Sequence, residues 1–174
     1  LIGKGFAVSF YLIRQASPSP AYLDKEAKVL HYYPYTVNDL HSSTVVLPKF
    51  RRGDLIIDAL FGIGLNRGLT GTAATAVEHI NASGVPVVAV DIPSGLNPDG
   101  NNFPGPVIQA NLTITFESPK LAFLLPQNHD RVGNFQIAAI GLNKNFLDRI
   151  ETDHFYLTET DAAVIMKQRT RHKF

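Results

Sequence analysis

The sequence predicts an α/β fold in which a mostly parallel sheet is covered by helices on both faces. Two apolar runs, residues 55–61 and 87–90, lack the polar alternation of a half-exposed strand, as expected of parallel strands buried on both faces. A segment with helical periodicity separates them, which gives the order strand, helix, strand. In this order the carboxyl ends of both strands meet at one edge of the sheet, where such folds bind ligands.

The composition of the chain excludes several classes of function. A chain of 174 residues suits one domain that can fold without disulfides or metals. Its net charge is +1, and its one basic cluster lies at residues 167–173, which argues against nucleic-acid binding. Without cysteine it has no disulfide, zinc–thiolate site or thiol nucleophile. There is no apolar run long enough for a membrane span and no visible signal peptide, so we expect a cytoplasmic protein with no membrane partner.

The N-terminal third has the weakest pattern. Residues 1–5 resemble the end of a strand, and residues 6–14 fit either a buried helix or a short strand. A Ser-Pro repeat at residues 17–20 ends that element. Residues 23–33 fit a helix or a strand equally well, and residues 34–52 show no period.

The pattern becomes regular from residue 54. After the first strand, we expect a helix capped by Thr72 and closed by Gly84. Its apolar face comprises Ala73, Ala76, Val77 and Ile80. Further strands are predicted at 112–116 and 135–140, and a short helix at 161–167. We therefore assign residues 1–155 to one domain and residues 156–174 to an extension or linker.

Polar residues at the ends of the two buried strands are the candidates for function. Asp58 interrupts an apolar run, and a buried carboxylate needs a hydrogen-bond partner or a cation; alternatively, Asp58 lies at an exposed strand end and caps a loop. Asp91 and Ser94 follow the second strand, where an ordinary turn is the alternative. The loop at 62–68 lacks dinucleotide-binding and Walker spacing, and Ser94 lacks the setting of a hydrolase nucleophile.

Three motifs in this order, at residues 54–65, 90–96 and 115–120, resemble the YjeF N-terminal domain family, the NAD(P)H-hydrate epimerases. The resemblance extends from about Asp54 to Gly141. It implies a Rossmann-like three-layer α/β/α sandwich, and an isomerase that interconverts the R and S epimers of nicotinamide nucleotides hydrated at C6 (NADHX and NADPHX). It also implies a homodimer or higher homo-oligomer.

The resemblance also implies roles for particular residues. Asp58 and Ser94 would bind a potassium ion as cofactor, and Asp91 would contact the substrate. The loop that would bind the substrate comprises Gly62, Ile63, Gly64, Leu65, Asn66, Arg67 and Gly68. We assign proton transfer to Asp91 rather than Asp58, because a carboxylate bound to a cation is held ionised.

One family feature is absent from this sequence. The family has a Gly-Asn-Asn-Gly-Gly-Asp-Gly loop between its first strand and helix, whereas here Gly5 is followed directly by Phe6. We expect such a loop to belong between these two residues in a longer chain. The basic end resembles a junction leading to an ADP- or ATP-dependent hydrate dehydratase domain.

A non-catalytic interaction module is the alternative function. The same fold serves as an assembly domain in an RNA-decapping scaffold and in an apolipoprotein-binding protein. The presence of Asp58, Asp91 and Ser94 favours the enzyme, and absence of the glycine-rich loop favours the module.

Overall fold

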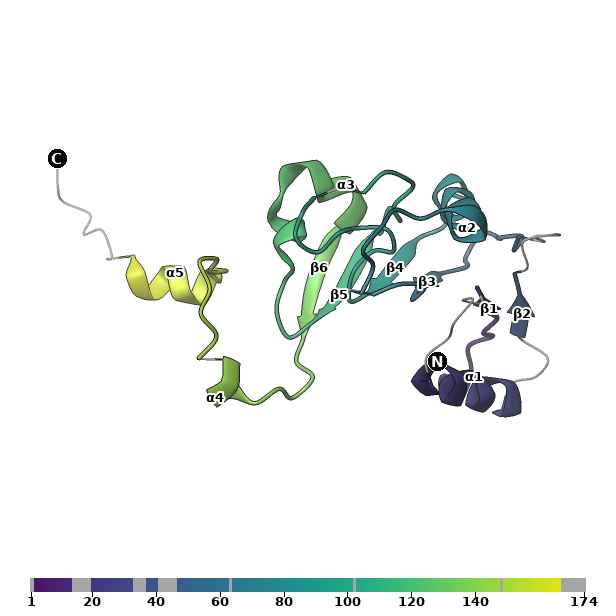
Figure 1. Cartoon of the computed structure of the whole chain (residues 1–174), viewed down its shortest axis with the longest axis horizontal. Coiled ribbons are helices and arrows are strands. Elements are labelled where there is room, and N and C mark those ends of the chain that lie inside the picture. Colours follow the sequence, from purple (N-terminus) through teal and green to yellow (C-terminus); the bar gives the residue numbers. More distant parts are fainter. Residues whose placement is uncertain are drawn as a thin grey trace.

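The computed structural model describes residues 2–13, 20–32, 37–40, 47–62, 64–101, 103–147 and 149–166. Within them the chain forms a four-stranded sheet of order β3-β4-β5-β6 and a two-stranded sheet, β1-β2 (Figure 1). All neighbouring strands run parallel. The strands are β1 (Phe10–Leu12), β2 (Val37–Asp39), β3 (Ile56–Asp58), β4 (Val87–Val90), β5 (Leu112–Phe116) and β6 (Asn134–Ala138). The α-helices are α1 (Pro20–Tyr32), α2 (Gly71–Ala82), α3 (His129–Val132), α4 (Lys144–Leu147) and α5 (Glu159–Ile165).

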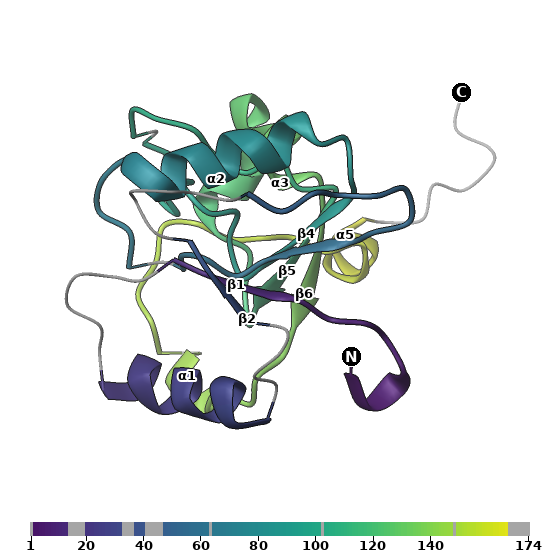
Figure 2. The same cartoon turned by 90° about the vertical axis from the view of Figure 1, so that its right-hand side faces the viewer.

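The helices form layers on the two sides of the strands. Figure 2 shows α2 and α3 on one side and α1 on the other, which confirms the predicted α/β/α arrangement. Because α2 connects β3 to β4, these strands follow the predicted strand–helix–strand order. They pair directly, with Asp58 opposite Ala89, so their carboxyl ends lie at the same edge.

Small and branched apolar side chains join α2 to the sheet. Val87 and Ala89 are buried on β4, and Ala73, Ala76 and Val77 are buried on α2. Burial of one face of the helix against the sheet is the main force that stabilises this unit. The resulting core cluster comprises Leu69, Ala73, Val77, Val87, Ala89, Ile108 and Ala110.

The start of α2 differs from the prediction. The N-cap residue is Thr70, not Thr72, and its side chain makes no capping hydrogen bond. Thr72 therefore lies inside the first helical turn, whose backbone N–H groups have no side-chain cap from Thr70. At the other end the expected glycine is confirmed: Gly84 follows the C-cap with φ 68°, a left-handed conformation that glycine adopts without steric cost.

The second half of the sheet follows the prediction closely. The strand at 112–116 is confirmed, and β6 begins one residue earlier than expected and ends at Ala138. Between β5 and β6 lie two 3₁₀ helices, η3 (Leu121–Leu124) and η4 (Pro126–Asn128), and then α3. They bury a second cluster, which comprises Ile92, Leu96, Val107, Ala122, Phe123 and Val132.

The N-terminal segment corrects two expectations. Residues 2–4 form a 3₁₀ helix, η1 (Ile2–Lys4), not the end of a strand. The ambiguous segment 6–14 contains the short strand β1, whose aromatic and branched residues suit a strand. A strand here removes the basis for placing the family's loop between Gly5 and Phe6, because that placement required a helix to follow.

The remaining ambiguous segments are also resolved in part. Residues 20–32 are helical, and β2 lies in the stretch that shows no period. This strand has only three residues, which is too short for the alternation of apolar and polar residues that identifies a strand in a sequence. The Ser-Pro repeat at 17–20 lies largely outside the described residues.

The C-terminal segment carries the predicted short helix, displaced by two residues. α5 begins with a capping box: Asp161 N donates to Thr158 Oγ1 (3.2 Å), and Thr158 N donates to Asp161 Oδ2 (2.9 Å). Hydrogen bonds from Thr158 lower the pKa of the Asp161 carboxyl. The basic residues 167–173 lie outside the described residues, so their role as a junction stays a prediction, as does the division of the chain at residue 155. None of the helices in the described part of the chain has the length and apolar character that crossing a membrane requires.

Candidate functional site

Asp58 and Ser94 form a buried hydrogen-bonded pair at the carboxyl edge of the sheet. Both residues are 1% exposed. Ser94 Oγ donates to Asp58 Oδ1 (2.6 Å), and Ser94 N donates to Asp58 Oδ2 (2.8 Å). Leu60 N makes a longer hydrogen bond to Oδ1 (3.3 Å). The alternative that Asp58 caps a loop from an exposed strand end is therefore wrong, since its main partner is a residue that follows β4.

The charge state of Asp58 depends on what else binds there. Burial raises the pKa of this carboxyl, and the hydrogen bonds from Ser94 and Leu60 lower it in part. Of the described residues, no lysine, arginine or histidine forms an ion pair with Asp58. Among the described residues, the groups that stabilise an ionised Asp58 are therefore its hydrogen-bond donors, Ser94 and Leu60.

The atoms around Asp58 are suited to a hard cation. Ser94 Oγ accepts a hydrogen bond from Phe61 N (3.0 Å) and lies 3.4 Å from the carbonyl oxygen of Phe61. Carboxylate, hydroxyl and carbonyl oxygens thus meet in one place, and such oxygens coordinate alkali and alkaline-earth ions. In the described ranges no three His, Cys, Asp or Glu side chains cluster as metal ligands. The oxygen donors suit a hard cation rather than a transition metal.

Asp91 follows β4 directly and lies in a strained turn. Its φ is 67°, and Ile92 N donates to Val90 O (2.9 Å), which makes Asp91 the centre of a γ-turn of the rare, strained type. The ladder nevertheless continues, because Asp91 N donates to Ile114 O (2.8 Å). In an ordinary turn, the aspartate side chain would accept a hydrogen bond from a backbone N–H group of the same turn. Strain of this kind is concentrated at functional sites.

The Asp91 side chain is directed toward the end of β5. Its Oδ1 accepts hydrogen bonds from Phe116 N (3.1 Å) and Thr115 Oγ1 (3.3 Å). Lys120 Nζ lies 3.0 Å from the same oxygen, and both charged side chains are 17% exposed. These three contacts on one oxygen hold the carboxylate in a single orientation.

The glycines of the loop at 62–68 fall into two groups. A Cβ atom on Gly68 would collide with the carbonyl oxygen of Pro104, so glycine is required there for close backbone packing. Gly62 and Gly64 have open space around their Cα atoms, which leaves their backbone accessible to a ligand. Asn66 and Arg67 are exposed. The side chain of Leu65 packs on the core, and Ile63 lies outside the described residues.

The structure thus brings together most of the predicted site residues. Asp58 contacts Ser94 directly, and the bond from Phe61 N to Ser94 Oγ joins the start of the 62–68 loop to this pair. Asp91 ends the neighbouring strand, which pairs with β3. Sequence reasoning missed Lys120, although this lysine closes the third motif of the resemblance. One feature of the sequence could have identified it: because β4 and β5 are predicted to be parallel, the residues that follow the two strands must lie at the same edge of the sheet.

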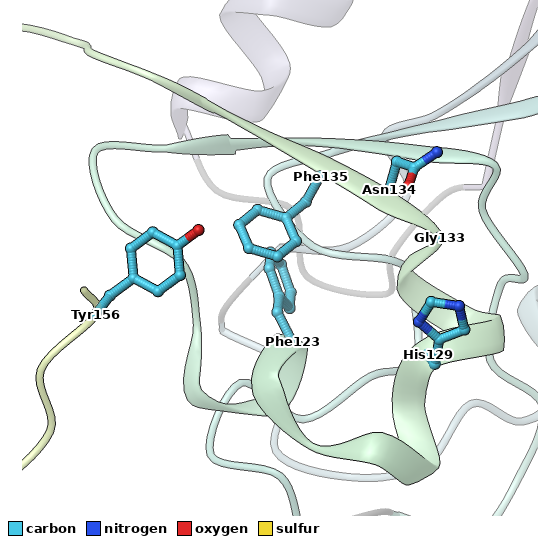
Figure 3. A pocket seen from close by; sticks show the side chains of 6 residues that line it. All are labelled: Phe123, His129, Gly133, Asn134, Phe135 and Tyr156. Carbon is cyan, nitrogen blue, oxygen red and sulfur yellow. The ribbon is translucent and has the colours of Figure 1, made fainter. Parts of the chain in front are cut away.

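A cavity of about 330 Å³ lies at the opposite edge of the sheet (Figure 3). Its lining consists of Phe123, His129, Gly133, Asn134, Phe135 and Tyr156. The Phe135 ring stacks at a tilt against both Phe123 (5.6 Å) and Tyr156 (6.1 Å). Because Asn134 begins β6, the cavity is at the amino ends of the strands and does not include the site residues.

Comparisons with known proteins identify named relatives of this chain. The NAD(P)H-hydrate epimerase of Levilactobacillus brevis is 32% identical over 85% of this chain and 65% of that protein. The enzyme of the same name from Limosilactobacillus fermentum is 35% identical over 78% of this chain and 62% of that protein. The bifunctional NAD(P)H-hydrate repair enzyme Nnr of Escherichia coli is 34% identical over 82% of this chain and 27% of that protein. This chain therefore spans less than two thirds of the length of these relatives.

The fold agrees with a solved structure as well. The crystal structure of yeast ynu0 superposes with a TM-score of 0.56 at 17% identity, over 87% of this chain and 63% of that chain. At this identity the likeness concerns the fold alone. The family model described as YjeF-related protein N-terminus matches residues 1–122. Because the family model matches most of this chain, the chain belongs to the YjeF-related N-terminal domain family.

Proposed function

We propose that this domain is an NAD(P)H-hydrate epimerase acting on NADHX and NADPHX in the repair of nicotinamide nucleotides. The observation that carries the proposal is the convergence of the buried Asp58–Ser94 pair and the strained Asp91 at one edge of a parallel sheet. Two relatives that bear this name support it. A non-catalytic module would have no use for a strained, charge-paired aspartate at this edge.

The chemistry requires little more than a well-placed carboxylate. Asp91 removes the proton of the C6 hydroxyl, and the electron pair of the C6–N1 bond moves to N1 as the ring opens to an aldehyde. Rotation of the aldehyde presents its other face. N1 then adds to that face, and Asp91 returns the proton to the oxygen, so that atoms and charge balance. A positioned base of this kind contributes about a hundredfold to ten-thousandfold to the rate.

Asp58, Ser94 and the Phe61 carbonyl are the groups that would hold potassium. When bound, the ion supplies a positive charge that keeps Asp58 ionised in its buried position. The pair also joins the turn after β4 to the loop after β3, through Ser94 N to Asp58 and Phe61 N to Ser94 Oγ. By fixing these two segments, the pair holds the start of the proposed substrate loop against the turn that contains Ser94.

The test is direct measurement of epimer exchange. Purified protein is mixed with one epimer of NADPHX in potassium buffer, and appearance of the other epimer is followed by NMR. We expect exchange well above the rate in buffer alone. No acceleration in the presence of bound substrate would contradict the proposed activity and favour the interaction module.

The loop at 62–68 gives a further prediction. Arg67 is exposed on this loop, and we propose that it contacts the substrate diphosphate, together with N–H groups of the loop and of the uncapped start of α2. Arg67→Met should raise the KM for NADPHX about tenfold, the value of one charged hydrogen bond. Arg149→Met removes an equally exposed arginine and should leave KM unchanged. Equal KM values for the two variants would show that Arg67 does not bind the substrate.

Three further expectations from the family belong to this proposal. We propose a homodimer or higher homo-oligomer, and a location in the cytoplasm. The E. coli relative is named as a bifunctional repair enzyme, and we propose that the present domain corresponds to its epimerase part. A dehydratase domain beyond residue 174 stays a prediction.

A further inference from the structure

Lys120 is held in place by two hydrogen bonds and an ion pair. Its Nζ donates to Phe116 O (3.2 Å) and Ser118 O (3.3 Å) and lies 3.0 Å from Asp91 Oδ1. An ammonium has three N–H donors, and two of them are bound to these carbonyl oxygens. The ion pair with Asp91 therefore ties the Asp91 carboxylate to an ammonium group that the chain already fixes.

The Asp91 carboxylate is used asymmetrically. Thr115, Phe116 and Lys120 all contact Oδ1, whereas no residue in the described ranges donates a hydrogen bond to Oδ2. Anchoring one oxygen fixes the rotation of the carboxylate and leaves the other oxygen available to a ligand. This is the arrangement expected of a base that must meet one particular proton.

Lys120 also belongs to a turn that repeats the one at Asp91. Glu117 has φ 62°, and Ser118 N donates to Phe116 O (2.7 Å), so β5 ends in the same strained γ-turn as β4. Lys120 contacts the Phe116 and Ser118 carbonyls that flank Glu117 and the carboxylate of Asp91. It thereby links the two strained turns, whose geometry must persist for the site to keep its shape.

We propose that Lys120 is a positioning residue for Asp91: it fixes the orientation of the carboxylate through Oδ1 and directs Oδ2 toward the C6 hydroxyl of the substrate. This inference rests on the proposed epimerase function and adds to it a residue that acts through Asp91. Misplacement of a reacting group by about 1 Å costs up to about a hundredfold in rate.

Among the described residues, Lys120 is the cation that forms an ion pair with Asp91. Glu117 Oε2 accepts a hydrogen bond from Ile140 N (2.8 Å), and Asp58 is hydrogen-bonded to Ser94, so these two carboxyls have other partners. Arg67 is exposed on the 62–68 loop. Removal of the Lys120 charge should therefore leave Asp91 without its compensating cation.

The experiment compares Lys120→Met with Lys120→Arg. Met keeps the aliphatic stem but removes the charge, so kcat should fall about tenfold to a hundredfold with little change in KM. Arg keeps a charged donor group that can contact the same carboxylate oxygen, so Lys120→Arg should recover part of the lost kcat. Lys49→Met, at an exposed lysine, is the matched control.

The outcomes separate the inference from the function it rests on. If the wild type catalyses no exchange, the proposed function fails before Lys120 is tested. If the wild type is active and Lys120→Met has an unchanged kcat, the positioning role is wrong. If Lys120→Met and Lys120→Arg lose kcat equally, or if KM rises as much as kcat falls, Lys120 only closes its turn, which also overturns the inference.

Discussion

Asp91→Asn should reduce the rate of epimer exchange by at least about a hundredfold while leaving substrate binding near the wild-type level. Asparagine has the shape of aspartate but cannot accept the hydroxyl proton. It also tolerates the left-handed backbone (φ 67°) better than most residues, and its side-chain oxygen can accept the bonds from Thr115 and Phe116. The fold and the turn should therefore survive the substitution. Exchange is measured by NMR, and binding by titration with the hydrated nucleotide.

The neighbouring strand offers a control with the same change of charge. Glu117 has almost the same backbone conformation as Asp91, but its carboxylate bonds to Ile140 N. Glu117→Gln removes an acid from the same edge of the sheet and should leave the exchange rate unchanged. Wild-type exchange by Asp91→Asn would assign the proton transfer to water and leave Asp91 only a binding role.

The parts of the fold that the sequence predicts correctly are those that bury the most apolar surface. β3, β4 and β5 are recognisable from runs of branched apolar and aromatic residues, although Ile57 on β3 is 44% exposed, so this strand is not buried on both faces as predicted. β1 and β2 are not recognisable, because the stretch that contains β2 has no apolar run and the segment that contains β1 fits a helix equally well. The helix cap at Thr70 instead of Thr72 reflects a similar limit, since several polar residues near a helix start are chemically able to cap it.

The sequence identifies residues for the candidate site, but it does not predict how these residues contact one another. An unpaired carboxylate in an apolar strand is costly in free energy, so Asp58 was expected to have a partner. The family resemblance assigned Ser94 to the same site. The strained turn at Asp91 left no trace in the sequence, because φ 67° at a non-glycine residue is imposed by the surrounding structure. Lys120 was missed because its contact with Asp91 arises only when β4 and β5 pair.

Asp58→Asn should abolish the stabilisation of the protein by potassium. For the wild type, potassium at about a hundredfold its Kd should stabilise the fold by about 2.7 kcal/mol, which raises Tm by roughly 5–10 °C in a chain of this size. The variant keeps the shape of the carboxyl and can still bond to Ser94, but it has no charge for the ion to neutralise. The measurement is thermal unfolding in potassium chloride and in choline chloride at equal ionic strength.

The pH dependence of stability in the wild type and in Asp58→Asn tests the burial of Asp58. Burial raises the pKa of Asp58 in the folded state, so the folded protein binds this proton more tightly than the unfolded chain does. The corresponding stability is fully present below the ordinary pKa of about 3.9 and is lost as the pH rises through the higher folded value. In choline buffer at neutral pH, Asp58→Asn should therefore be more stable than the wild type, and potassium should remove this difference. Asp99→Asn, at an exposed carboxylate, should behave like the wild type in both salts. An equal potassium response in Asp58→Asn and wild type would show that the ion does not bind at Asp58.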